Sequence, residues 1–130
     1  MKANFLPHFT LGSFGALGLL HFAAESFYFY WTLFWFDILM HFLGGISVGL
    51  ATFWLISHLK LFQNKEAPQL SLFFLALLAT LVVSFFWEVL EHLTGTAKAV
   101  EGYFLDTTID TSTALLGAAF ISILVSRRFT

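Results

Sequence analysis

The sequence predicts an all-α polytopic membrane protein, in which four transmembrane helices form a compact bundle. Hydrophobic residues make up 58% of the 130 residues and charged residues only 11%, and the mean hydropathy is +0.84. A soluble domain is usually about 25% charged, and a chain this small could not hide so much apolar side chain from water. We therefore expect one transmembrane domain covering residues 1–130.

Four stretches are long and apolar enough to be transmembrane helices. A spanning helix needs about 20 mostly apolar residues to cross a hydrocarbon core roughly 30 Å thick. The expected spans are residues 4–24, 37–59, 69–95 and 106–126. Polar breaks that contain Pro or Gly, at 62–68 and 94–102, separate the last three spans.

An aromatic segment, residues 26–36, lies between the first two spans. Eight of the ten residues from Phe27 to Phe36 are aromatic. Tyr and Trp collect at membrane–water interfaces. We therefore expect an interfacial helix or loop here, and the alternative is that the segment extends one of its neighbouring helices.

The basic residues predict the orientation in the membrane. Four spans put the N-terminus, the second connection and the C-terminus on one side, which then carries five of the six basic residues. These five are Lys2, Lys60, Lys65, Arg127 and Arg128, whereas Lys98 alone falls on the other side. Because basic residues favour the cytoplasmic side, we expect both termini to be cytoplasmic. The expected location is the cell membrane of a prokaryote.

Composition also excludes several classes of function. The chain has no Cys, which rules out disulfides, thiolate nucleophiles, iron–sulfur clusters and Cys-type zinc sites. Its net charge of −2 argues against a nucleic-acid partner, because no basic surface is available to neutralise phosphates. The expected surroundings are the lipid bilayer, and the glycine-containing helix faces described below permit self-association.

Nearly all ionisable residues of the spans are expected at one end of the bundle, and the exceptions are His8 and His58 toward the inner leaflet. The residues at the shared end form pairs spaced i,i+4, which share one helix face. The pairs are His21/Glu25, Asp37/His41, Glu88/His92 and Asp106/Asp110, with Glu91 three residues after Glu88. All of these lie at the ends of the spans that the basic residues place on the outer side.

Such a set of carboxylates is costly in a membrane unless a cation accompanies it. A charge at mid-bilayer costs about 2.5–3.5 kcal/mol, and carboxylates that face only each other repel. A divalent ion resolves both problems, and Asp, Glu and His without Cys suit Zn, Mn, Fe or Mg. The expected metal ligands are Asp37, His41, Glu88, His92, Asp106 and Asp110.

Three other interpretations of this pattern remain open, and in the simplest one the groups lie scattered at the interface with no joint role. The groups could form a metal-free polar network, as in a transporter or a proton pathway. The chain could also be a non-catalytic membrane subunit that binds a lipid or cofactor, for which the aromatic segment would be suited. The apolar inner halves of the spans give little support to a continuous pathway across the membrane.

Small and hydroxyl residues accompany the ionisable groups. Gly44-Gly45 and Gly49 follow His41 and include a GxxxG step, which favours close helix packing. Small residues at Ala114, Gly117 and Ala118 predict the same for the last span. Five hydroxyl residues surround the two Asp residues of that span: Thr107, Thr108, Thr111, Ser112 and Thr113. Their hydroxyl groups could orient the carboxylates, bind a polar group of a substrate or form hydrogen bonds with the backbone of their own helix.

Three short motifs carry a family resemblance. Residues 36–45 (FDILMHFLGG) resemble the Asp-x-x-x-His-Phe helix start of VanZ-like membrane proteins, and more closely their YjdF-type relatives. Residues 87–91 (WEVLE) resemble the Glu-bearing helix of that group, and 106–110 (DTTID) with 116–118 (LGA) resemble its closing helix. The resemblance implies a small polytopic helical membrane protein and little about its biochemistry.

The function that these observations favour is a membrane-embedded divalent-metal site at the outer interface. If the protein is an enzyme, the expected reaction is metal-assisted hydrolysis or transfer on a lipid or lipid-linked headgroup. In that reaction Glu88 or Glu91 is the expected general base.

Overall fold

The computed structural model describes residues 5–61, 69–95 and 102–126, and these residues are almost entirely helical. The helices are α1 (Leu6–Ser26), α2 (Phe29–Thr32), α3 (Phe36–His58), α4 (Gln69–Thr94) and α5 (Tyr103–Ser126). The four long helices match the four predicted spans to within three residues at each end. The predicted breaks at 62–68 and, in large part, 94–102 lie outside the described residues.

Three of these helices are long and apolar enough to cross a membrane. They are α3, α4 and the part of α5 from Tyr103 to Val125. The 21-residue helix α1 is long enough but not apolar enough to join them, because two His and several small or polar residues interrupt its apolar sequence. The all-α membrane fold is therefore confirmed, whereas the count of four spans is not.

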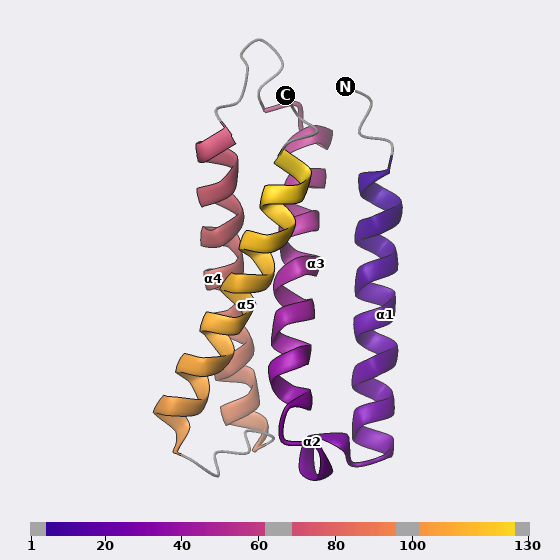
Figure 1. The fold of residues 1–130 in the computed structure, drawn as a ribbon, viewed down its shortest axis with the longest axis vertical. Coiled ribbons are helices and arrows are strands. Elements are labelled where there is room, and N and C mark those ends of the chain that lie inside the picture. Colours follow the sequence, from indigo (N-terminus) through magenta and orange to yellow (C-terminus); the bar gives the residue numbers. More distant parts are fainter. Residues whose placement is uncertain (1–4, 62–68, 96–101, 127–130) are drawn as a thin grey trace.

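The four long helices run up and down side by side in a bundle (Figure 1). Helix α3 packs against α1, α4 and α5, and α4 also packs against α5. α3 and α5 run in the same direction, and α1 and α4 run in the opposite one (Figure 1). The start of α1 and the end of α5 therefore lie at one end, and α2 lies at the other.

Close backbone packing fixes the register between α3 and α5. A Cβ added at Gly45 would overlap the carbonyl oxygen of Ala114, and one at Gly49 would lie 2.6 Å from Cγ2 of Ile121. From the other helix, a Cβ at Gly117 would overlap the carbonyl oxygen of Phe42. The GxxxG step on α3 therefore packs directly on the small residues of α5, as the sequence predicts.

The core lies mainly between α3, α4 and α5. On α4 the buried residues recur every fourth position, and they change from apolar to polar toward its C-terminal end. They are Leu72, Ala76, Thr80, Ser84 and Glu88. Many large apolar side chains on the outside of the helices are exposed, including Leu19, Phe22 and Phe104. An apolar outer surface is what a bundle in lipid requires.

The aromatic segment forms the short helix α2 between two turns. Tyr28, before α2, has φ +59°, in the left-handed region, and α1 has already ended at Ser26. Leu33 is extended, and α3 begins at Phe36. The segment thus extends neither neighbour, and Phe29 and Tyr30 pack their rings on Phe36.

Candidate metal centre

The start of α3, the end of α4 and the start of α5 meet at the same end of the bundle (Figure 1). This arrangement follows from the helix directions, because α4 is antiparallel to both of its partners. It brings together Asp37 and His41 from α3, Glu88 and Glu91 from α4, and Asp106 and Asp110 from α5. We call these six residues the carboxylate–histidine cluster.

Three overlapping groups of donor atoms exist within the cluster. In each group, one ligand atom per residue lies within 4.8 Å of the others. The groups are Asp37/His41/Glu91, His41/Glu88/Asp110 and Asp37/Asp106/Asp110. Because Asp37, His41 and Asp110 each belong to two groups, the donors surround one common region and could hold a metal ion.

His41 is at the centre of the cluster. Its Nε2 lies 3.6 Å from Oδ1 of Asp37, one turn earlier on α3, and 3.5 Å from Oδ2 of Asp110 on α5. The second contact follows from the close packing of the two helices, because His41 lies one turn before Gly45 on α3 and Asp110 lies one turn before Ala114 on α5. The residue numbers differ by 69 in each pair between the two helices: His41 with Asp110, Gly45 with Ala114, and Gly49 with Ala118.

Three members of the cluster are almost completely buried. The exposed fraction is 8% for His41, 3% for Glu88 and 2% for Asp110. Oε1 of Glu88 and Oδ2 of Asp110 are buried without a hydrogen-bond partner. A buried carboxylate oxygen without a donor is costly, and of these two atoms only Oδ2 of Asp110 has a nitrogen nearby, Nε2 of His41 at 3.5 Å. A positively charged or hydrogen-bond-donating ligand could therefore bind between the helices at Oε1 of Glu88.

Helix dipoles offset part of the negative charge. Asp37 lies in the first turn of α3 and Asp106 in the first turn of α5, where backbone N–H groups give the helix end a partial positive charge. The parallel direction of α3 and α5 therefore places two such ends beside the cluster. The end of α4 contributes the opposite sign, so its dipole does not stabilise negative charge on Glu88 and Glu91.

Hydroxyl groups position the acidic side of α4. Thr107 donates its hydroxyl to Oε2 of Glu88 at 2.9 Å, and Ser84 donates to the Thr111 hydroxyl at 3.3 Å. Thr108 and Thr113 bond carbonyl oxygens of their own helix instead. Thr107 therefore has one of the roles that the sequence left open for these hydroxyl residues, which is to orient a carboxylate.

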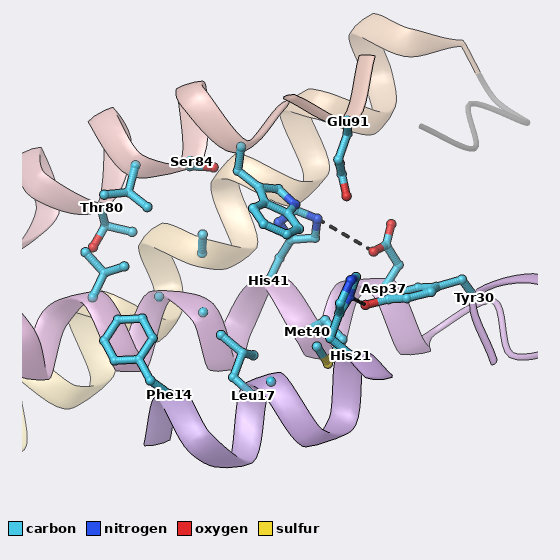
Figure 2. Close-up of a pocket in the computed structure, with 17 residues that line it drawn as sticks. Phe14, Leu17, His21, Tyr30, Asp37, Met40, His41, Thr80, Ser84 and Glu91 are labelled. Carbon is cyan, nitrogen blue, oxygen red and sulfur yellow. Dashed lines mark hydrogen bonds and ion pairs between the residues drawn. The ribbon is translucent and has the colours of Figure 1, made fainter. Parts of the chain in front are cut away.

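A cavity of about 340 Å³ opens beside the cluster. Its walls come from α1, α3 and α4, with Tyr30 from α2 and Ala114 from α5. Figure 2 shows Asp37, His41 and Glu91 near one another at one end, with Phe14 and Thr80 farther along the helices. A void of this size is in the range of small-ligand sites.

The aromatic segment closes the polar end of the cavity. The Tyr30 hydroxyl and Nδ1 of His21 are 2.8 Å apart, within hydrogen-bond distance (Figure 2). The His21 ring also packs edge-on against Trp87. Burial, and then the negative charges of Asp37, Glu25 and Glu91, raise the pKa of Tyr30, so its phenol remains neutral at physiological pH.

Three residues of the predicted pairs lie outside the cluster, and one of them, His21, pairs with Tyr30 as described above. His92, which the sequence predicts as a ligand, is exposed and packs on Tyr103 with the ring centroids 4.6 Å apart. It belongs to none of the three donor groups among the described residues. Glu25 is exposed at the end of α1. Glu91, predicted only as a base, lies where His92 was expected.

A family model described as "Predicted membrane protein (DUF2238)" matches residues 3–130. The chain belongs to this family. The match covers nearly all of the sequence and agrees with the apolar helices described above. No curated protein and no solved structure matches the chain significantly. The family description supports a small membrane protein, and the likeness to VanZ-like and YjdF-type proteins rests on the three motifs alone.

Proposed function

We propose that the protein binds a divalent cation in the membrane through the carboxylate–histidine cluster. The observation that carries this proposal is the buried Oε1 of Glu88, which has no hydrogen-bond partner, within a set of mutually close donors that includes the buried Oδ2 of Asp110 beside Nε2 of His41. A divalent ion among them would supply the missing partner and reduce the repulsion between carboxylates.

The geometry favours some ligands over others. His41, Glu88 and Asp110 form the group in which all three members are buried, so they are the proposed inner ligands. Asp37 and Asp106 complete the set on the half-buried side. One imidazole with several carboxylates suits Zn, Mn or Fe, and also Mg if His41 stays outside the first coordination shell.

Glu91 is the better placed of the two candidate bases. Glu88 is buried and held by Thr107, whereas Glu91 is half-buried and lines the cavity. The reaction that this arrangement supports best is hydrolysis or transfer on a lipid or lipid-linked headgroup. In hydrolysis, Glu91 takes the proton of the attacking water, whose oxygen bonds to the ester carbon or phosphorus, and returns that proton to the alcohol oxygen as its bond to that atom breaks. A divalent cation held by the cluster would lower the pKa of the water and polarise the reacting oxygen.

The proposal includes a membrane topology with four spans. Helix α1 has 21 residues, lies antiparallel along α3 and buries Leu6, Thr10 and Ala24. If α1 spans, both termini share one side and the cluster lies at the opposite interface. The positive-inside rule then makes the termini cytoplasmic. Of the basic residues behind this argument, Lys60 is exposed after α3. The others, Lys2, Lys65, Lys98, Arg127 and Arg128, lie outside the described residues.

Elemental analysis of the purified protein tests the metal site. The wild-type protein, extracted in detergent without chelator, should carry about one divalent ion per chain. Asp37→Asn and Asp110→Asn keep side-chain size and should lower the metal content about tenfold or more. Glu25→Gln, which removes a carboxylate outside the cluster, is the matched control and should retain the ion.

Each alternative outcome has a defined meaning. Equal, substoichiometric metal in all four proteins would disprove the metal site and favour a metal-free polar network. In that case, ion-driven flux in proteoliposomes would indicate a transporter, and a co-purified pigment or fixed partner protein would indicate a binding subunit. Elution volume in gel filtration checks that each variant is folded.

A further inference from the structure

The cavity beside the cluster has the length of one membrane leaflet. Its lining runs from Asp37 to Val48 on α3 and from Thr80 to Glu91 on α4. Eleven residue steps at 1.5 Å each give roughly 16 Å along each helix. Half of a hydrocarbon core roughly 30 Å thick is about the same length. The cavity therefore reaches from the interface to about mid-membrane.

The two ends of the cavity differ in chemistry. Near the interface it is lined by His21, Tyr30, Asp37, His41 and Glu91. Deeper, the walls are apolar, from Phe14 and Leu17 on α1 and Val48 and Val83 on α3 and α4. Two hydroxyl residues also line this part: the hydroxyl oxygen of Thr80 is buried, and Ser84, itself buried, donates its hydroxyl to Thr111. The lining thus changes from polar at the interface to apolar at depth. This matches an amphiphile, whose headgroup is polar and whose acyl chain is apolar.

The cavity lies between two helices whose backbones do not pack on each other. Among the described residues, α1 and α4 both flank α3, and they meet through side chains in the edge-on contact of His21 with Trp87 at the interfacial end. Phe14 and Val83, on the two sides, are 43% and 48% exposed. The gap between α1 and α4 therefore gives lateral access from the surrounding lipid, whereas α3 forms its floor.

We propose that this cavity holds one acyl chain of a membrane phospholipid, with the headgroup at the carboxylate–histidine cluster. The position of the headgroup rests on the proposed metal centre, because an anionic phosphate needs a cation between it and the carboxylates. The acyl chain itself is held by apolar contacts that do not depend on the metal. The ligand class of the site is thus a phospholipid that enters from the bilayer.

Two glycines in the wall allow the cavity to be filled without disturbing the packing. Gly18 and Gly44 line it, and a Cβ added at either position meets no atom within 4 Å. Gly15 is the matched control, because its added Cβ also meets open space but the residue does not line the cavity. Leu at 18 or 44 should therefore exclude the chain, and Leu at 15 should not.

Native mass spectrometry of protein extracted from vesicles of phosphatidylethanolamine and phosphatidylglycerol gives the readout. The wild type and Gly15→Leu should retain one phospholipid, and Gly18→Leu and Gly44→Leu should retain about tenfold less. Lysophosphatidylglycerol, with one chain, should displace the lipid, and glycerol phosphate should not. Retention that is absent in the wild type, or equal in all variants, would overturn the proposal, as would displacement by glycerol phosphate.

Metal content in the same samples separates this inference from the proposed function. Gly18→Leu should keep its metal while losing its lipid. If the wild type carries no metal but retains a lipid that Gly18→Leu loses, the acyl-chain site is supported and the metal centre is disproved. With metal present, EDTA treatment should weaken phosphatidylglycerol retention, and unchanged retention would overturn the placement of the headgroup.

Discussion

Thr107 and Glu88 are joined by a hydrogen bond of 2.9 Å from the hydroxyl of Thr107 to Oε2 of the carboxylate. The bond crosses between α5 and α4 and engages only one oxygen of Glu88. The other oxygen, Oε1, is buried without a hydrogen-bond partner. Thr107 therefore fixes the carboxylate in an orientation that leaves Oε1 available to a ligand in the cluster.

Removal of this hydroxyl should weaken metal binding. Thr107→Val keeps the shape of the side chain but leaves Glu88 without that donor, and loss of such an orienting partner typically lowers metal affinity about 10–100-fold. Competition with a chromogenic chelator measures the change. Thr108→Val is the control, because Thr108 is exposed and bonds the Phe104 carbonyl oxygen. Equal affinities in the two variants would contradict the role given to Thr107.

The two histidines near the cluster should behave differently. His41→Gln removes a buried donor that lies 3.5 Å from Asp110 and should abolish tight metal binding. His92→Gln changes an exposed ring that packs on Tyr103, and the metal content should stay within about twofold of wild type. Elemental analysis of both variants decides the matter. Metal loss in His92→Gln alone would restore the ligand that the sequence predicts.

The α3–α5 contact should be intolerant of a single methyl group. Gly45→Ala would place its Cβ on the Ala114 carbonyl oxygen, so the helices must separate. Such overpacking typically lowers the free energy of unfolding by about 1–3 kcal/mol. The adjacent Gly44→Ala meets open space and should be neutral or slightly stabilising, because Ala favours helix. Thermal unfolding in detergent compares the two variants, and equal midpoints would argue against the close contact.

The absence of Cys makes the topology straightforward to test. Single cysteines at Thr32, Leu61 and Lys2 can be labelled in cells with a membrane-impermeant maleimide. We expect labelling of Thr32→Cys in intact cells, and of Leu61→Cys and Lys2→Cys only after permeabilisation. If Lys2→Cys reacts together with Thr32→Cys instead, α1 does not span and the protein has three spans. Labelling of Leu61→Cys in intact cells would reverse the proposed orientation.

Helical periodicity made the cluster predictable. The spacing of Asp37/His41 and Asp106/Asp110 places each pair on one face, and hydropathy gives the depth of each helix end. Together these predict which ends meet, and the structure brings them together. The GxxxG step likewise predicts a close helix contact, although the sequence does not say which helix is the partner.

Periodicity could not decide between Glu91 and His92. Relative to Glu88, a residue three positions on lies about 60° to one side, and a residue four positions on lies about 40° to the other. Which side faces α3 depends on how α4 packs, and this is a property of the whole bundle. For the same reason the cavity was not predicted, because it arises from α1 and α4 standing apart on α3.

The constant offset of 69 positions between α3 and α5 has a consequence for insertions and deletions. The contact of His41 with Asp110 and the backbone packing of Gly45 on Ala114 lie on the same two facing sides of α3 and α5, one helical turn apart. One extra residue between His41 and Gly45 would rotate the Asp37–His41 pair by about 100° and turn it out of the cluster. A change of length in the connections between helices would leave that alignment untouched. Loop length is thus free to vary, whereas the four-residue step from imidazole to glycine is not.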